Sequence, residues 1–366
     1  MVVGVQEYRC TMERTEYQKR TEHDKREKLR KIKPKVVEKF EKYEELHARG
    51  QYTPIVEFTY DYRCNMSCPH CSNLCFAPQK RSLTPEIIKR FCDEADAMGL
   101  AQMSVSGGEP LMFPDLEDVV KAIGPDRFHI SMSTNGSLLT LEKAKWVKSI
   151  GIDKLKISLD CIDEDGPSFH DKGQTSLALV ALDNAKKADL QPVAQTVITH
   201  QNCRTPEVER MAAYCQERDI QVDVLLGKAI GRWEGQEEIL VDGADLKYIR
   251  KLHEKYPVLH LDTFPTYQEK EGSCGAVKKI LVVTKYGDIM PCVFMHFSLG
   301  NIIDDSLAEI MKRGLSIRYF RNSSPICLSG VDRRFIKKHM SKFYGKKLPI
   351  SYKEAFSEED FVKDDE

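Results

Sequence analysis

The stretch IVEFTYDYRCNMSCPHCSNLC, residues 55–75, joins a β-rich run to a loop that carries four cysteines. Its first part is rich in β-branched and aromatic residues, which predicts a strand. Cys64, Cys68 and Cys71 follow soon after that strand. In a parallel α/β architecture, the loops at the carboxyl ends of the strands build the site. Three thiolates in such a loop can bind three corners of a [4Fe–4S] cluster and leave its fourth iron open to a small molecule.

Two other metal centres fit the same loop. Zinc takes four ligands, which Cys64, Cys68, Cys71 and Cys75 would supply. A ferredoxin-like cluster would use the same four thiolates and would only carry electrons. The loop alone does not decide between these two centres and an open cluster.

Strand and helix patterns alternate after Tyr52. Runs such as IVEFTY, QMSVSG and KLKISLD are separated by helical stretches, and six such steps lie between Tyr52 and Gly235. One helix start is clear, because Thr84-Pro85-Glu86 places an N-cap, a first-turn proline and an acid in order. This alternation predicts an α/β fold with a parallel sheet and helices outside it. Six steps are too few for a full eight-stranded barrel, so a partial barrel or an open sheet is expected.

Other segments flank this core. Residues 1–50 are highly charged, which predicts a solvated helical extension with one helix from about 34 to 48 that ends at Gly50. A connecting helix and linker are expected over 236–272, and a small domain with a β-hairpin and a helix over 273–340. The hairpin turn is predicted at Tyr286-Gly287-Asp288, and residues 341–366 are expected to form a tail.

The composition excludes several classes of protein. The chain has 366 residues, with 55 Lys and Arg against 56 Asp and Glu. This balance gives no global field that would attract nucleic acid or a membrane surface. The N-terminal sequence lacks the apolar core of a signal peptide, and no apolar run is long enough to span a bilayer. We therefore expect a cytoplasmic protein whose 12 cysteines stay reduced. The clustered thiols indicate metal or redox chemistry and not a disulfide scaffold.

Polar residues collect at the ends of successive predicted strands. The second strand ends in Gly107, Gly108 and Glu109, where the glycines allow close approach of the backbone to a ligand and the carboxylate suits an ammonium group. The third strand ends near Asn135, and the fourth ends with Ser158 and Asp160. Taken in order along the sheet, these positions favour a ligand site.

With the cysteine loop and Gly107-Gly108-Glu109-Pro110, residues 52 to about 235 resemble the radical S-adenosylmethionine (radical SAM) enzymes. The resemblance implies a partial (β/α)6 TIM-like barrel in which Cys64, Cys68 and Cys71 hold the cluster. The open iron would bind S-adenosylmethionine, and an electron from a reductant such as flavodoxin or ferredoxin would yield a 5′-deoxyadenosyl radical. The resemblance places Gly108 and Glu109 at the amino group of the cofactor, and Asn135 and Ser158 at further contacts. Met66 would pack near the adenine.

A second set of cysteines lies towards the C-terminus. Cys274 and Cys292 flank the predicted hairpin, and Cys327 follows the next helix. This part is similar to the Twitch or SPASM extension, which carries auxiliary iron–sulfur clusters. The fuller pattern often has another cysteine where this chain has Gly330, so we expect one auxiliary cluster at most. Its fourth ligand is left open among Asp332, His339, a distant cysteine and the substrate.

Simpler interpretations of these three cysteines also stand. They are reduced thiols of a hydrophobic core in one, and part of a zinc site in the other.

The residues that would act on the substrate are less clear from the sequence. Cys161 and Cys203 follow strand ends and suit a hydrogen-atom donor, although a buried cysteine is commonly a small hydrophobic residue. Asp160 suits a general base or a cap of the next loop. Gln195 is expected to line the pocket. Arg232 suits the cofactor carboxylate, a substrate anion or a surface salt bridge.

Three functions follow from these patterns. The first is a radical oxidoreductase or epimerase that acts on a small polar metabolite, such as a sugar, aminocyclitol or amino acid. The second is a maturase that forms a crosslink or a D-residue in a ribosomally made peptide. The third is a non-catalytic iron–sulfur or zinc protein.

His170 and Asp171 match a His-Asp segment of related enzymes, but the arginine that follows it there is absent, so no role for that arginine is transferred.

Overall fold

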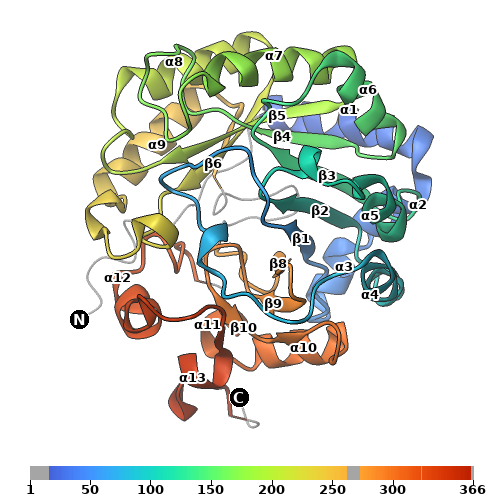
Figure 1. The fold of residues 1–366 in the computed structure, drawn as a ribbon, viewed down its shortest axis with the longest axis vertical. Helices are drawn as coiled ribbons and strands as arrows, with labels where there is room; N and C mark the ends of the chain where they lie inside the picture. The colour runs from blue at the N-terminus through green and yellow to red at the C-terminus, as the bar shows by residue number, and fades with distance from the viewer. Residues whose placement is uncertain (1–15, 262–272, 323, 364–366) are drawn as a thin grey trace.

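A computed structural model describes residues 16–261, 273–322 and 324–363 of the chain. Within them, one sheet has the strand order β11-β9-β8-β1-β2-β3-β4-β5-β6-β7. Strands β1 to β6 are adjacent in chain order and pair in parallel. Each is followed by a helix, and Figure 1 shows these helices around the outside of the strands. The predicted α/β fold with six strand–helix steps in a partial barrel is confirmed.

The bounds of these elements position the loops that carry the site. The strands are β1 (Ile55–Asp61), β2 (Gln102–Gly107), β3 (His129–Thr134), β4 (Lys154–Ser158), β5 (Gln191–Ile198) and β6 (Gln221–Leu226). The helices that follow them are α4 (Pro85–Ala97), α5 (Leu116–Ile123), α6 (Leu141–Ser149), α7 (Gln174–Lys187), α8 (Pro206–Glu217) and α9 (Gly243–Lys255). The predicted start of α4 is confirmed, because the Thr84 hydroxyl accepts a hydrogen bond from the backbone N–H of Ile87.

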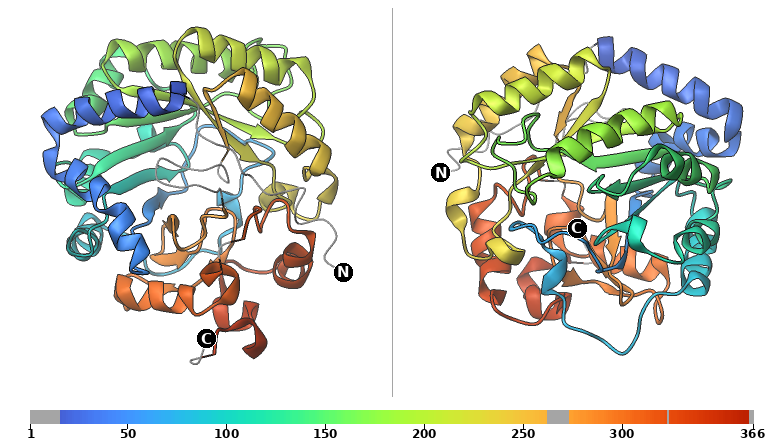
Figure 2. Two further views of the ribbon diagram at one scale, coloured as in Figure 1. Left: turned by 180° about the vertical axis from the view of Figure 1, so that it is seen from behind. Right: turned by 45° about the horizontal axis from the view of Figure 1, so that its top comes forward.

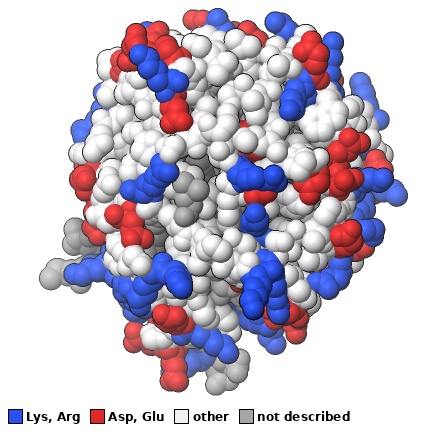
Figure 3. Space-filling view, viewed as in Figure 1, with Lys and Arg blue, Asp and Glu red and all other residues white. Residues whose placement is uncertain are grey.

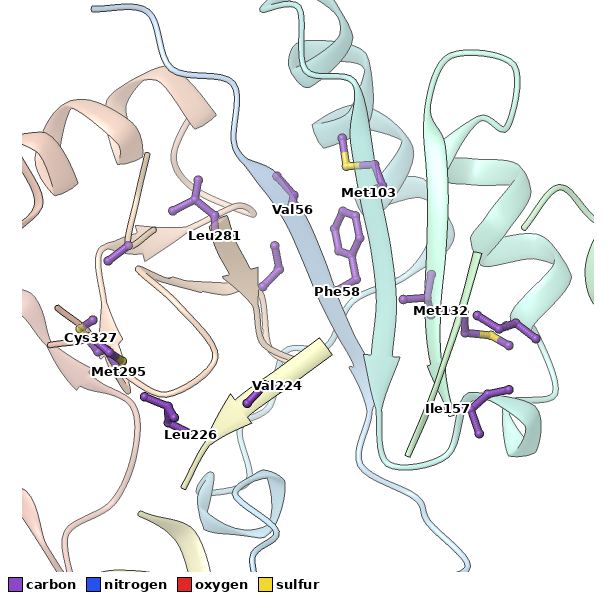
Figure 4. Packing of buried hydrophobic residues seen from close by; sticks show 14 of the residues in the cluster. Val56, Phe58, Met103, Met132, Ile157, Val224, Leu226, Leu281, Met295 and Cys327 are labelled. Carbon is purple, nitrogen blue, oxygen red and sulfur yellow. The ribbon is translucent and has the colours of Figure 1, made fainter. Parts of the chain in front are cut away.

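The two faces of the barrel strands differ in character. Phe58 of β1 meets Phe91 of α4 edge to face, with 5.7 Å between the ring centroids, so this face of the strand points to the helices. Figure 4 shows Phe58 beside Met103 of the neighbouring strand β2 in this apolar layer. Side chains alternate along a strand, so the residues that alternate with these outward-facing ones line the inside of the barrel. In β4, the buried Leu155 and Ile157 alternate with half-buried polar residues.

The C-terminal hairpin continues the barrel sheet. Strand β8 (Ile280–Val283) pairs in parallel with β1, so that Val56 lies opposite Leu281, and β9 (Asp288–Met290) pairs antiparallel with β8. Its turn lies at the predicted place, where the N–H of Thr284 donates to the carbonyl of Asp288 over 2.9 Å. The sequence predicted the hairpin but not its attachment to β1.

Shorter elements complete the C-terminal half. They are β7 (Leu259–Leu261), β10 (Phe297–Ser298), β11 (Gly300–Asn301), β12 (Ile350–Ser351), α10 (Leu307–Leu315), α11 (Arg318–Arg321), α12 (Arg333–Phe335) and α13 (Tyr352–Ala355). Figure 1 shows α10 to α13 together at one end of the molecule. Residues of this half and of the barrel share one hydrophobic cluster, which includes Cys327, Met295 and Leu226 (Figure 4).

The N-terminal helices are more tightly attached than a solvated extension. They are α1 (Glu16–Ile32), α2 (Pro34–Glu41) and α3 (Tyr43–Ala48), so the single helix expected over 34–48 is interrupted at Lys42. Val36 and Val37 are fully buried. Lys33 Nζ donates to Asp153 Oδ2 over 2.5 Å, and Lys39 Nζ donates to the carbonyl of Leu100 over 2.8 Å.

Asp153 and Leu100 precede strands β4 and β2, so α1 and α2 cover the amino-terminal edge of the sheet. Figure 2, left, shows them crossing the back of the barrel. Residues 1–15 of the predicted extension and 262–272 of the predicted linker lie outside the described residues.

The surface carries charges of both signs. On the face seen in Figure 3, Lys and Arg side chains are interspersed with Asp and Glu side chains. None of the helices in the described part of the chain is long and apolar enough to span a bilayer.

Candidate active site

The loop after β1 carries Cys64, Cys68 and Cys71 at the carboxyl edge of the sheet. The N–H of Cys71 donates to the carbonyl of Cys68 over 3.2 Å, and the N–H of Met66 donates to Cys64 Sγ over 3.4 Å. Burial raises the pKa of the Cys64 thiol, and raises that of Cys68 to about 12. These thiols therefore keep their protons at neutral pH unless a metal replaces the protons.

The glycines at the end of β2 allow the chain to approach itself. The N–H of Gly108 donates to the carbonyl of Asp61, and the N–H of Glu109 donates to that of Arg63, each over 2.8 Å. A Cβ atom at Gly108 would lie 1.9 Å from the Arg63 carbonyl oxygen, and one at Gly107 would lie 2.1 Å from that of Asp61. Sequence reasoning assigned the two glycines to the approach of a ligand. In the structure they hold Glu109 against the first residues of the cysteine loop.

Glu109 is a fully buried carboxylate at the centre of the strand ends. Its Oε1 accepts hydrogen bonds from the N–H of Leu111 over 3.0 Å and from the Thr134 hydroxyl over 2.7 Å. Its Oε2 accepts one from the N–H of Asn135 over 2.8 Å. Burial raises the pKa of this carboxyl group, whereas the three donors favour its ionised form. No Lys or Arg among the described residues forms an ion pair with it, so the position suits the ammonium group of a ligand.

Asn135 connects the end of β3 to the cysteine loop. Its Nδ2 donates to Asn65 Oδ1 over 2.9 Å, next to the half-buried Met66. Ser158 and Gln195 lie opposite each other on β4 and β5, and both are half-buried. The structure therefore places these four predicted cofactor contacts along the same edge of the sheet as Glu109.

The loop after β6 holds the cysteine loop from the other side. Arg232 Nη1 donates to the carbonyl of Ser67 over 2.7 Å and to the Ser67 hydroxyl over 2.9 Å. A Cβ atom at Gly231 would lie 2.5 Å from the carbonyl oxygen of Cys71. Arg232 thus fixes the backbone between two of the cysteines. With the residues that the structure describes, it forms no salt bridge of the kind that the sequence left open.

Asp160 caps the segment that carries His170. Its Oδ2 accepts hydrogen bonds from the N–H of Phe169 over 3.0 Å and from Nδ1 of His170 over 2.8 Å, and its Oδ1 accepts one from the N–H of Val197 over 3.1 Å. These contacts match the capping role that the sequence offered as the alternative to a general base. Asp171 Oδ2 in turn accepts the N–H of Ser67 over 3.0 Å, so the segment docks on the cysteine loop.

His70 completes this contact between segments. Its Nδ1 donates to the carbonyl of Phe169 over 3.0 Å, and its ring centroid lies 5.6 Å from that of Trp233. Burial lowers the pKa of His70 to about 4, so the ring is neutral at pH 7.

The two cysteines considered as hydrogen-atom donors are packed away from the cysteine loop. Cys161 and Cys203 are both fully buried. The Cys161 thiol donates to the carbonyl of Asp163 over 3.2 Å, and the Cys203 thiol donates to that of Asp245 over 3.6 Å. Among the described residues, neither thiol forms a hydrogen bond to the cysteine loop. Cys203 belongs to the hydrophobic cluster and so matches the interpretation as a small buried hydrophobic residue, whereas the Cys161 thiol also lies 3.6 Å from the Thr175 hydroxyl.

Cys274, Cys292 and Cys327 come together beside the hairpin. Burial raises the pKa of Cys274 and of Cys292, and the neighbouring thiols raise both further. The N–H of Phe294 donates to Cys292 Sγ over 3.4 Å. Three sulfur donors that interact electrostatically, one on a buried and two on half-buried residues, suit a soft metal centre such as an iron–sulfur cluster.

Of the two side chains proposed as a fourth ligand, Asp332 is engaged in a helix cap, whereas His339 keeps its Nε2 without a hydrogen-bond partner among the described residues. Asp332 Oδ1 accepts the N–H groups of Arg334 and Phe335, each over 3.0 Å, and so caps a helix. His339 Nδ1 donates to the carbonyl of Ala355 over 3.1 Å.

Sequence reasoning missed three lysines of the barrel strands and loops. Lys154 and Lys156 lie on the inner face of β4, and Lys228 follows β6. The alternation in KLKIS signals the first two, but the same pattern is typical of an ordinary exposed strand. Nothing local in the sequence signals Lys228.

Comparison with known proteins identifies the two cysteine sites. Residues 61–203 match the radical SAM superfamily, and residues 274–329 match the SPASM iron–sulfur cluster-binding domain. The chain carries a radical SAM domain followed by a SPASM domain. The radical SAM domain binds a [4Fe–4S] cluster and S-adenosylmethionine, and the SPASM domain implies an auxiliary iron–sulfur centre. The three cysteines of the first loop, the buried carboxylate of Glu109 and the second thiol set fit these groups.

Proteins similar to this chain are named for, or bound to, different molecules. A probable GTP 3′,8-cyclase from Methanosarcina mazei is 27% identical over 264 residues, which cover 66% of this chain and 77% of that protein. The Streptococcus suis protein SuiB bound to precursor peptide SuiA superposes with a TM-score of 0.56 at 15% identity, over 75% of this chain and 69% of SuiB. The protein anSMEcpe, with AdoMet and the Cp18Cys peptide, gives 0.54 at 18% identity, over 71% of this chain and 80% of that one. The two structural matches show the fold alone.

Proposed function

We propose that this radical SAM protein removes a hydrogen atom from a small, anionic substrate bound inside the barrel. Cys64, Cys68 and Cys71 would hold the [4Fe–4S] cluster. When bound and reduced, the cluster and S-adenosylmethionine supply a 5′-deoxyadenosyl radical. The protein binds and orients both partners of this reaction and keeps water away from them.

The residues around the cluster have separate tasks in this proposal. Glu109 is fixed by its three donors and holds the ammonium group of the cofactor, while Met66 packs against the adenine. Asn135 and Arg232 hold the cysteine loop in place from opposite sides. Ser158 and Gln195 lie on the inner face of the sheet, where cofactor and substrate meet.

Two lysines on β4 are the main reason to propose an anionic substrate. Lys154 and Lys156 alternate with two buried apolar residues, so both lie on the inner face of the strand. Neither lysine has a hydrogen bond or ion pair with the described residues. Burial, together with the charges of Lys156 and of Lys25 on α1, lowers the pKa of Lys154 to about 8 against the opposing effects of Asp223 and of Glu22 on α1. A phosphate or carboxylate of a substrate would compensate these two charges.

The relatives support a small anionic substrate as well. The curated relatives are named probable GTP 3′,8-cyclases, so a nucleoside phosphate is the first substrate to test. Because Cys161 and Cys203 are buried and bonded locally, the structure offers little support for epimerisation by a thiol donor. Oxidation or bond formation is therefore the favoured outcome. We propose flavodoxin or ferredoxin as electron donor and the cytoplasm as location.

The test is reductive turnover of the reconstituted protein under anaerobic conditions. GTP, other nucleoside phosphates, sugar phosphates and short acidic peptides are supplied in separate reactions, and 5′-deoxyadenosine and product are quantified. A peptide is the alternative substrate, since SuiB and anSMEcpe have been solved with peptides. We expect a phosphorylated small molecule to be consumed, and transfer of deuterium from it into 5′-deoxyadenosine.

A matched pair of variants tests the lysines. Lys156→Met is expected to raise KM for the anionic substrate at least tenfold without changing substrate-free cleavage of the cofactor. Lys145→Met, an exposed lysine on α6, is expected to leave both unchanged. Turnover of a neutral substrate or of a peptide alone would contradict the proposal.

A further inference from the structure

Lys228 is a buried cation next to the auxiliary cysteines. It lies two residues beyond β6, after Gly227, whose N–H donates to the carbonyl of Ile198 over 2.7 Å. Only 4% of its surface is exposed. Its Nζ has no hydrogen-bond partner among the described residues, although a buried ammonium without one is costly.

The contacts of this side chain point to the cysteine triad. Its Nζ lies 3.9 Å from the centroid of the Phe294 ring, and the backbone N–H of Phe294 donates to Cys292 Sγ. The charge of Lys228 acts on the Cys292 thiol and lowers its pKa, against the larger effect of burial. One aromatic ring thus stabilises the ammonium in part, but a ring does not neutralise a charge.

Gly330 makes room for Lys228 beside Cys327. A Cβ atom at Gly330 would lie 3.2 Å from Lys228 Cε and 3.4 Å from Cys327 Sγ. A side chain at this position would therefore crowd the end of the lysine and contact the thiol. Where a fuller set of cysteines would place one more thiolate, this chain has a glycine, and the end of the Lys228 side chain lies beside it.

We propose that the Lys228 ammonium is the counter-charge of the iron–sulfur centre held by Cys274, Cys292 and Cys327, and that it raises the reduction potential of that centre. Three thiolates outweigh the positive charge of a [4Fe–4S] core, so the bound centre is anionic in both of its usual oxidation states. A nearby cation stabilises the more negative, reduced form more strongly. The proposal rests on the assignment of these three cysteines to the auxiliary centre.

The experiment measures the reduction potential of the auxiliary centre by EPR during a redox titration. The parent is the full-length protein with Cys64, Cys68 and Cys71 all changed to Ala, so that only the auxiliary signal remains. Lys228→Met removes the charge at similar length, and Lys228→Arg keeps it. Lys255→Met is the matched control, because Lys255 also lies over an aromatic ring, that of Tyr256, but at the surface. Iron, sulfide and circular dichroism are measured for every variant.

The proposal predicts that Lys228→Met binds iron fully but shows an at least tenfold lower ratio of reduced to oxidised centre at a fixed potential, which is ~59 mV for one electron. Lys228→Arg and Lys255→Met should match the parent. If Lys228→Met loses the centre while Lys228→Arg keeps it, with the fold intact, the charge is needed to bind the centre, and the proposal is supported. An unchanged potential in a fully loaded Lys228→Met would overturn it, as would equal loss in both Lys228 variants.

The outcome is separable from that of the proposed function. If the parent binds no iron at all, the assignment of the auxiliary cysteines is wrong and the counter-charge proposal is overturned. Formation of 5′-deoxyadenosine by the wild-type protein would still be observed in that case. Conversely, a wild-type protein that turns over no anionic substrate leaves the potential shift of Lys228→Met measurable.

Discussion

Lys228 and Arg232 lie on the same loop after β6, and they contact different cysteine sites. The Lys228 side chain ends at the triad of the SPASM domain, whereas Arg232 donates to the backbone of the cysteine loop in the radical SAM domain. Between them, Gly231 lies directly against Cys71. One short loop therefore sets the surroundings of both metal sites, and changes in it should affect them separately.

Gly231→Ala should displace the cysteine loop. Gly231 has a φ of +64°, and a Cβ atom there would lie 2.5 Å from the carbonyl oxygen of Cys71. We expect the variant to bind less iron at the first site while it keeps its auxiliary iron, as measured by iron analysis and EPR. Gly345→Ala is the matched control, because Gly345 has a φ of +73° with nothing within 4 Å. The control should lose about 1 kcal/mol of stability but no iron. Equal iron content in both variants would contradict the account.

Glu109→Gln should weaken binding of the cofactor. The three donors around Glu109 suit a carboxylate, whereas an amide would turn an NH₂ group towards at least one of them. We expect a destabilisation of about 1–3 kcal/mol. Because the charge that faces the cofactor ammonium is also lost, the Kd for S-adenosylmethionine should rise at least tenfold. Anaerobic calorimetry and denaturant unfolding measure the two effects, with the exposed Glu117→Gln of α5 as control. Unchanged affinity would remove Glu109 from the site.

A variant of Cys75 distinguishes a cluster with three protein ligands from a cluster with four. It follows the other three cysteines on a short turn (Asn73–Cys75). Burial raises the pKa of its thiol, and the nearby Cys71 contributes to this increase. If the cluster has three protein ligands, Cys75→Ala keeps its iron and its cleavage of S-adenosylmethionine, whereas Cys71→Ala loses both. Iron analysis and 5′-deoxyadenosine yield give the answer. Loss of iron in Cys75→Ala would favour a fully ligated cluster, whereas zinc in place of iron at this loop would favour a zinc site.

Binding of the anionic substrate should depend on pH through Lys154. Burial holds its pKa at about 8 in the free protein, so the group is mostly protonated at pH 7 and loses its charge as the pH rises above about 8. An anion binds to the protonated form. The apparent KM should therefore be nearly constant between pH 7 and 7.5 and should rise towards pH 9.5. In Lys154→Met, the KM should be higher throughout and should lose most of this rise, and an identical pH profile in both proteins would exclude Lys154.

The first metal site could be predicted from sequence because its signals are local. Cys64, Cys68 and Cys71 lie in one loop, and Glu109 follows two glycines that fit only a close approach of backbones. The alternation of strands and helices likewise predicts the barrel, because each strand and each helix is a short segment with its own hydrophobic period. The sequence did not show which backbone groups the glycines contact, because Asp61 and Arg63 approach them only in the folded sheet.

The features that were missed depend on long-range packing. Pairing of β8 with β1 joins residues such as Val56 and Leu281, and no local pattern encodes it. Lys154 and Lys156 have the same spacing in a barrel lumen as on a water-facing strand. The proposed role of Lys228 depends on its contacts with Phe294 and Gly330, which are far away in sequence.

The central claim is that the first cluster has one iron free for S-adenosylmethionine. Its most direct test is EPR of the reduced, anaerobically reconstituted protein with and without S-adenosylmethionine. We predict that the cofactor changes one cluster signal, that this signal is absent from Cys71→Ala, and that 5′-deoxyadenosine forms in the same sample. A protein that binds only zinc, or a cluster signal that the cofactor leaves unchanged, would contradict the account.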